Sequence, residues 1–202
     1  MYYATVAAAA LHQVLLRTMT KALRDDNVVA QNVASGLFCV MFVALGVADR
    51  PTLLAATMLG YLISDSTSVT TPGYAVHHVV TAMLLLVSLR GEGAYDDLTV
   101  VLGGYGEAST ILLCVADTFK QRPRLQKAYP RANRAARYAF ALAFFGLRVG
   151  YWSLWIVPWK GPPPVRGGLY ALLGLQYYWG FCILKKVARS IDRCPSSSKL
   201  IR

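Results

Sequence analysis

Long apolar segments alternate with short polar segments along the whole chain. Six segments of about 16 to 22 residues carry few charges and are long enough to cross the hydrocarbon core of a bilayer as α-helices. They are residues 28–48, 52–69, 74–89, 98–117, 137–158 and 168–187. The second and third are short and would require helix tilt or local membrane thinning. The pattern predicts an all-α, polytopic membrane bundle of six transmembrane helices.

A further apolar stretch precedes these six segments. It contains Arg17 and Lys21 but lacks the basic start of a secretory signal peptide. We expect residues 1–27 to form a short, retained membrane-associated helix with a basic segment; a seventh span and a mitochondrial address are alternatives. Residues 28–187 would then form the transmembrane domain, and residues 188–202 a basic, flexible tail.

The charged residues are few but strongly asymmetric. Only 15% of residues are charged and 55% are hydrophobic, whereas a soluble domain has roughly 25% charged residues. The chain has 21 Lys and Arg against 10 Asp and Glu. A balance this basic can indicate nucleic-acid binding, so the positions of the basic residues decide the interpretation.

We number the segments between the apolar stretches alternately as side X, which contains the N-terminal segment, and side Y. Side Y receives only Arg50, Arg90, Lys160 and Arg166, and Arg148 lies inside an apolar segment. All other basic residues fall on side X. This is the positive-inside pattern, so we expect side X, with the basic loops and the C-terminus, to face the cytosol or the mitochondrial matrix. The expected partners are membrane lipids, and we expect no nucleic acid.

Cysteine and histidine usage gives no sign of a metal centre. The four cysteines form no C-x-x-C pair, so reduced thiols are expected. The three histidines are too few for a histidine-rich di-iron site. We therefore predict no bound metal and no resident cofactor.

A first polar layer lies near side X in the second and third apolar segments. Asp65 in one segment and His77 and His78 in the next lie about one helical turn from the same membrane surface. Tyr61 and Thr81 lie one turn deeper on the same helix faces. Adjacent helical residues point about 100° apart, so one of the two histidines could instead contact headgroups or a carbonyl. We assign catalytic chemistry, if there is any, to His77, His78 and Asp65.

A second polar layer lies near the membrane midplane. Glu107, Arg148 and Gln176 are each about halfway along the last three segments. Charges at this depth normally face the protein interior and pair, so we predict a Glu107–Arg148 ion pair with Gln176 nearby. Such a pair could serve only to fix the helix register. With Tyr61, Thr81 and Ser109, these residues form the predicted lipid-binding set, whereas Tyr105, Tyr177, Tyr178 and Trp179 are assigned to packing.

The order of four motifs and one arginine resembles the TLC-domain family. The motifs are NVASGLF, GYLISD, HHVVT and GEASTILL, and Arg148 follows them. The family includes ceramide synthases, translocating-chain-associated membrane proteins and smaller TLC-domain proteins of lipid homeostasis. The resemblance covers roughly residues 28–187. It implies a bundle of six or more helices around a lipid-accessible cavity that opens toward the cytosol.

The resemblance also implies roles for individual residues. Ceramide synthases transfer a fatty acyl group from coenzyme A to a sphingoid amine, and their paired histidines match His77 and His78. Thr81 and Asp65 match a threonine and an acid of the family motifs. Where the synthases have a His-Asp-x-x-Asp element, this chain has Glu107 and Ser109 in the stretch GEASTILL, which is closer to the smaller non-synthase members.

The leading hypothesis is a multi-pass protein that binds, senses or modifies a lipid or acyl chain in an intramembrane cavity. One alternative is a non-catalytic accessory subunit of a larger membrane complex, which could be mitochondrial. The other is an acyltransferase similar to ceramide synthase, for which acyl-CoA would be required. We expect the endoplasmic reticulum membrane, with the mitochondrial inner membrane as the alternative.

Overall fold

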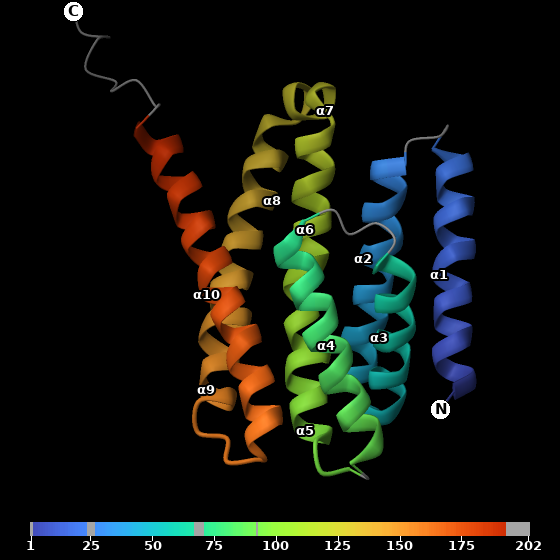
Figure 1. The fold of residues 1–202 in the computed structure, drawn as a ribbon. Coiled ribbons are helices and arrows are strands. Elements are labelled where there is room, and N and C mark those ends of the chain that lie inside the picture. The colour runs from blue at the N-terminus through green and yellow to red at the C-terminus, as the bar shows by residue number, and fades with distance from the viewer. Residues whose placement is uncertain (1, 24–26, 67–70, 92, 193–202) are drawn as a thin grey trace, which may run out of the picture.

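The structure is a computed structural model that describes residues 2–23, 27–66, 71–91 and 93–192, and it is a bundle of roughly parallel and antiparallel helices (Figure 1). The described residues contain no β-strand. The helices are α1 (Tyr2–Ala22), α2 (Asn27–Val47), α3 (Pro51–Asp65), α4 (Pro72–Arg90), α5 (Asp96–Leu98), α6 (Gly106–Gln121), α7 (Pro123–Ala128), α8 (Pro130–Ala143), α9 (Trp152–Ile156) and α10 (Pro163–Asp192). Two wider π-helical segments, η2 (Thr99–Tyr105) and η3 (Phe144–Tyr151), join α5 to α6 and α8 to α9.

Proline marks where many of these helices begin. It is the first residue of α3, α4, α7, α8 and α10. Proline suits this position because its missing N–H would have no partner within the helix and its φ is already helical. The all-α fold class predicted from the sequence is therefore confirmed for the described residues.

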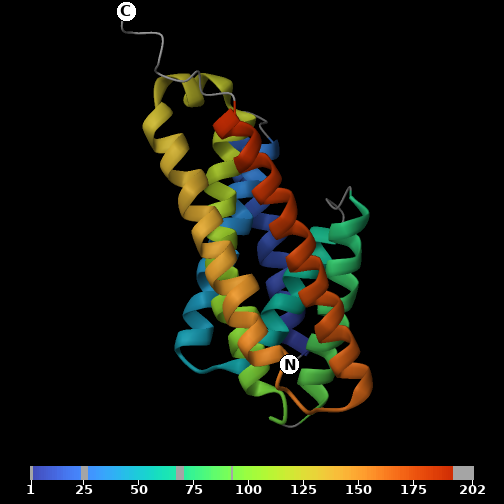
Figure 2. The same cartoon turned by 90° about the vertical axis from the view of Figure 1, so that its left-hand side faces the viewer.

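Six helical rods surround the centre of the bundle. In order around the ring, α2 packs against α3, α3 against α4, α4 against α10, α10 against η3 and α9, α8 and η3 against α6, and α6 against α2. α1 lies outside this ring and packs mainly against α3 (Figures 1 and 2). The ring brings all six predicted segments to a common interior.

The predicted number of six spans is not confirmed. Among the residues that the structure describes, four stretches are long and apolar enough to cross a membrane: Val29–Val47, Pro72–Arg90, Asp96–Gln121 and Pro130–Ile156. α3 has 15 residues, which corresponds to roughly 22 Å, less than the ~30 Å hydrocarbon core. α10 has 30 residues but carries basic residues such as Lys185 and Lys186 in its C-terminal part. The protein is therefore multi-pass, with four helices that meet both criteria.

The N-terminal and C-terminal predictions need adjustment in length. α1 has 21 residues rather than a short helix, and it packs closely because Gly60 of α3 lies against the α1 backbone. Of the predicted tail 188–202, the first part belongs to α10, which ends at Asp192, and residues 193–202 lie outside the described residues.

Glycines permit the closest crossing inside the ring. A Cβ atom added to Gly46 of α2 would lie 2.9 Å from the Cα atom of Gly104 in η2. A larger side chain at either position would force the two backbones apart. This contact draws η2, and with it the start of α6, toward α2.

Burial follows the pattern of a protein surrounded by hydrocarbon. Val40, Val79, Met83, Leu86 and Leu142 are all exposed on the outside of the bundle. Exposed apolar surface on this scale is typical of a face that meets lipid.

The buried residues form two clusters. One joins α1, α2 and α3 around Phe42 and Leu54, and the other joins α5, α9 and α10 around Ile156 and Leu169. Of the two cavities described below, the smaller is lined by residues of both clusters, and the larger is lined by residues of the first.

The helices do not all reach the same level at one end of the bundle. α7, the C-terminal end of α1 and the C-terminal end of α10 lie at one end, which corresponds to side X (Figure 1). The C-terminal end of α3 and the start of α4 lie below the level that α2 and α6 reach at this end (Figure 1). The polar side chains at the end of α3 are thus recessed within the bundle.

Candidate functional site

A chamber of about 290 Å³, whose mainly apolar lining includes a cluster of polar side chains, lies inside the ring of helices. Its volume is near the lower limit of the ~300–1,000 Å³ that is typical of small-molecule sites. The residues that line it from α3, α4 and α6 to η3 and α10 include nearly all the predicted site: Tyr61, Asp65, His77, His78, Thr81, Glu107, Ser109 and Arg148. Lys186, an exposed residue of α10, also lines the chamber and places one of its edges toward side X.

Asp65 and His78 form a pair across α3 and α4. The Asp65 Oδ2 atom lies 3.2 Å from Nε2 of His78, and both side chains are largely buried. Gln31 of α2 donates a hydrogen bond from Nε2 to Oδ1 of Asp65. The predicted common depth of Asp65 and His78 is confirmed. Gln31 was not anticipated, because an amide near the start of an apolar segment gives no signal in the sequence.

Both ring nitrogens of His78 are occupied. Nδ1 lies 2.9 Å from the carbonyl oxygen of Tyr74, which can only accept, so Nδ1 must carry a proton. Nε2 faces the Asp65 carboxyl group, so it either donates to a carboxylate or accepts a proton held by Asp65. In both cases His78 has no free lone pair, and it is a poor candidate for a general base.

His77 faces a different environment from its neighbour. The two imidazole rings have centroids 5.8 Å apart and planes at 81°, and His77 lies 5.6 Å from the ring of Trp179. Its Nδ1 atom and the Oγ1 atom of Thr81 are buried without a hydrogen-bond partner among the described residues. His77 and Thr81 stand one turn apart on α4, so they present their unpaired atoms from the same helix face.

Arg148 is the centre of a hydrogen-bonded cluster. Its Nη2 atom donates to Oε1 of Glu107 and to Oγ1 of Thr110, each at 2.7 Å, and its Nε atom donates to Oγ of Ser109 at 2.8 Å. Trp152 lies beside the guanidinium, 5.4 Å from its ring centroid to Cζ. The predicted Glu107–Arg148 pair is confirmed, and Ser109 and Thr110 complete it.

The two π-helical segments help to position this cluster. Arg148 lies within η3, and Glu107 lies at the second residue after η2. A π-helical turn contains more residues than an α-helical turn and often occurs at functional sites. Nothing in the apolar periodicity of segments 98–117 and 137–158 indicates these wider turns.

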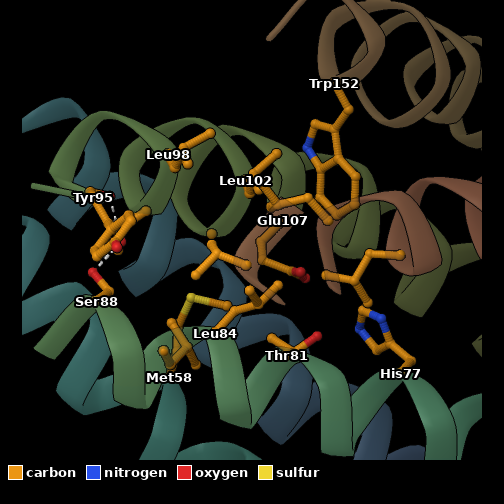
Figure 3. Close-up of a pocket in the computed structure, with 16 residues that line it drawn as sticks. Met58, His77, Thr81, Leu84, Ser88, Tyr95, Leu98, Leu102, Glu107 and Trp152 are labelled. Carbon is orange, nitrogen blue, oxygen red and sulfur yellow. Dashed lines mark hydrogen bonds between the residues drawn. The ribbon is translucent and has the colours of Figure 1, made fainter. Parts of the chain in front are cut away.

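A second cavity, which we call the slot, adjoins the chamber. It has a volume of about 60 Å³ and is almost entirely apolar. Met58, His77, Thr81 and Glu107 line both cavities. In Figure 3 the side chains of Thr81 and Glu107 point toward each other beside His77, while Leu84, Leu98 and Leu102 continue the slot away from them. Ser88 and Thr99 hydrogen-bond at 2.6 Å near the other end of the slot.

Two predicted assignments differ from the structure. Gln176 is fully buried, but it lines neither the chamber nor the slot, and neither amide atom has a hydrogen-bond partner among the described residues. Trp179, which the sequence assigns to packing, lines the chamber next to His77. Tyr177 and Tyr178 are exposed rather than packed. On a membrane helix, aromatic residues alone do not reveal which face points inward.

Tyr61 belongs to an aromatic group at the chamber wall. Its hydroxyl group donates to Oγ of Ser35 at 3.1 Å, and its ring contacts Phe38 and the buried His12. His12 of α1 in turn hydrogen-bonds to Ser64 of α3 at 2.7 Å. This group ties the N-terminal helix to the wall of the chamber.

A comparison with protein-family models identifies the fold. The model of the TLC domain matches residues 1–185. The chain belongs to the TLC-domain family. Within this TLC domain the match includes α1 as well as the ring of helices. Searches of curated proteins and of solved structures find no match.

Within the part of the chain that the structure describes, no group of three or more His, Cys, Asp or Glu side chains could hold a metal ion. The chamber is lined by the Asp65–His78 and Glu107–Arg148 pairs and by His77 and Thr81, whose side chains each keep a buried polar atom without a partner among the described residues.

Proposed function

We propose that this TLC-domain protein binds a lipid or acyl chain inside the membrane, with the polar part in the chamber and a chain in the slot. The observation that carries the proposal is the junction of a polar and an apolar cavity at His77, Thr81 and Glu107. An amphiphile fits such a junction because its polar head can hydrogen-bond to the polar side chains of the chamber while its apolar chain lies in the apolar slot.

The distribution of polar groups supports binding or sensing more directly than catalysis. The Asp65–His78 pair occupies both nitrogens of His78, and no carboxylate orients His77 by a hydrogen bond among the described residues. A general base is normally oriented by such a group.

The proposal is tested with two variants of the same helix. Leu84 lines the slot, whereas Leu86 is exposed on the outside of α4. Leu84→Trp fills the slot and is expected to remove most of the lipid that co-purifies with the protein. Leu86→Trp adds the same bulk outside and is expected to retain it. Mass spectrometry of lipids extracted from both purified variants measures the difference.

The result is interpretable when both variants elute from a sizing column as the wild type does. If Leu84→Trp and Leu86→Trp co-purify with the same amount of lipid, the proposal is contradicted.

A second candidate function is acyl transfer, which the free imidazole of His77 favours. A neutral imidazole in the chamber could accept a proton from an amine that attacks an acyl-CoA thioester. Transfer from a long-chain acyl-CoA to a long-chain amine by the purified protein would be lost in His77→Ala. Absence of transfer by the wild-type protein would remove this candidate.

We also propose that α3 and α10 complete six crossings, with side X in the cytosol or matrix. Support comes from the basic residues at the α7 end and the C-terminal part of α10, which share one end of the bundle (Figure 1). Single cysteines introduced at Arg50 and at Ser66, which flank α3, should be labelled from opposite sides of a sealed vesicle, and so should single cysteines at Lys160 and at Lys186, which test α10. Labelling of either pair from the same side would exclude an odd number of crossings between its two positions. Imaging of the tagged protein separates the endoplasmic reticulum from mitochondria.

A further inference from the structure

The charges that line the chamber are balanced within the protein. Asp65 faces His78, and Glu107 contacts Arg148 at 2.7 Å. Lys186 is exposed at the edge toward side X. An ionic headgroup at the junction would therefore meet no uncompensated opposite charge, and a buried unpaired charge is costly.

The junction instead offers two unpaired neutral groups. Nδ1 of His77 and Oγ1 of Thr81 are both enclosed, so bulk water does not satisfy them. An unsatisfied buried polar atom costs roughly 1–3 kcal/mol, and a ligand that bonds to it removes this cost. Both residues line the chamber and the slot, so a group that lies between the two cavities contacts both side chains.

The chemistry of these two groups selects the ligand group. A threonine hydroxyl donates and accepts, and a neutral imidazole has one donor and one acceptor nitrogen. A ligand hydroxyl also donates and accepts, so it can bond to both at once.

The slot limits the hydrophobic part of the ligand. The slot has about 60 Å³ of apolar space, is lined by Leu84, Leu98 and Leu102, and has the Ser88–Thr99 hydrogen bond near its other end, so it has room for part of one chain and not for two. We propose that the junction binds the uncharged hydroxyl group of a single-chain lipid, whose chain enters the slot. Long-chain alcohols and monoacylglycerols share this chemistry. The inference rests on the proposed lipid-binding function.

The test uses four photoreactive probes with the same diazirine-bearing chain. Their ends are a hydroxyl, a methyl ether, an amine and a carboxylate. For the wild-type protein in nanodiscs we expect the alcohol to label slot peptides more strongly than the other three. Thr81→Val should reduce labelling by the alcohol about three- to tenfold and leave labelling by the ether unchanged, as expected for one lost hydrogen bond.

Thr81→Ser keeps the hydroxyl group and should restore labelling by the alcohol, which separates loss of the bond from loss of the fold. Competition by unlabelled monoacylglycerol or unlabelled long-chain alcohol then identifies the source of the hydroxyl. Stronger labelling by the amine or the carboxylate, or an alcohol-to-ether ratio that Thr81→Val does not change, would overturn the inference.

The two proposals fail in different ways. If all four probes label the slot equally and Leu84→Trp blocks them all, lipid binding stands and selection of a hydroxyl is wrong. If no probe labels the slot and Leu84→Trp retains as much lipid as Leu86→Trp, both proposals are wrong.

Discussion

The Arg148 cluster and the His77–Thr81 face lie on the same cavity system but are opposites in hydrogen bonding. Arg148 donates to Glu107, Ser109 and Thr110, so three of its five N–H groups are already bonded within the protein. His77 and Thr81 each keep a buried polar atom without a partner. Buried polar groups in proteins are normally bonded, so the unbonded pair is the better indicator of a binding site. The Glu107–Arg148 pair links two helices of the bundle, whereas His77 and Thr81 keep polar atoms that a ligand could bond to.

The largest effect is expected from breaking the Arg148 cluster. Arg148→Met leaves Glu107 buried without its counter-charge, which should lower the free energy of unfolding by about 3–5 kcal/mol. Adding Glu107→Leu removes the isolated charge and should recover most of the loss. Thermal unfolding in detergent, followed by tryptophan fluorescence, measures both effects.

Arg134→Met serves as the control, because Arg134 is exposed on α8. Similar unfolding temperatures for Arg148→Met and Arg134→Met would show that the cluster does not stabilise the bundle.

An intermediate effect is expected at the Asp65–His78 pair. Asp65→Leu leaves His78 and Gln31 without their shared partner and should lower the free energy of unfolding by about 1–3 kcal/mol. Asp65→Asn should cost less, because its amide can donate to Nε2 of a neutral His78 while Nδ1 continues to donate to Tyr74. Equal losses in the two variants, measured by thermal unfolding, would argue against this pairing.

The smallest effect is expected when two threonines are compared, one with a hydrogen-bonded hydroxyl group and one without. Thr57 donates to the carbonyl oxygen of Leu53 at 2.6 Å, whereas Thr81 has no bonded partner among the described residues. In lipid-free protein, Thr81→Val should raise the free energy of unfolding by about 1 kcal/mol, and Thr57→Val should lower it by a similar amount. Thermal unfolding after delipidation gives both signs. A loss at Thr81 as large as that at Thr57 would mean that its hydroxyl is already satisfied.

The sequence was most informative where a charge lies in an apolar segment. Glu107 and Arg148 could be paired in advance because each would be costly alone at that depth, and Asp65 could be placed near His78 because both are close to the same surface. The same reasoning is weak for uncharged polar residues. Gln176 can be buried without joining the site, since its burial costs less than that of a charge.

Other features of the site could not be predicted from one sequence. Which histidine pairs with Asp65 depends on the rotation of α4 relative to α3, and hydrophobic periodicity does not fix this angle when apolar residues occur all around a helix. Trp179 could not be distinguished from packing residues for the same reason. The slot depends on how Leu84, Leu102 and their neighbours fill the space between two clusters, which is a property of three-dimensional packing.

Because α3 is short, the path from the membrane surface to the chamber is short as well. Its end, with Asp65, is recessed below the neighbouring helices on side X, and a helix of 15 residues draws the headgroup layer inward where it ends. An amphiphile moving laterally in that leaflet therefore needs to sink its polar end only partway before it meets Asp65 and His78. The short α3 would therefore reduce the depth that a polar headgroup has to cross between the membrane surface and the chamber.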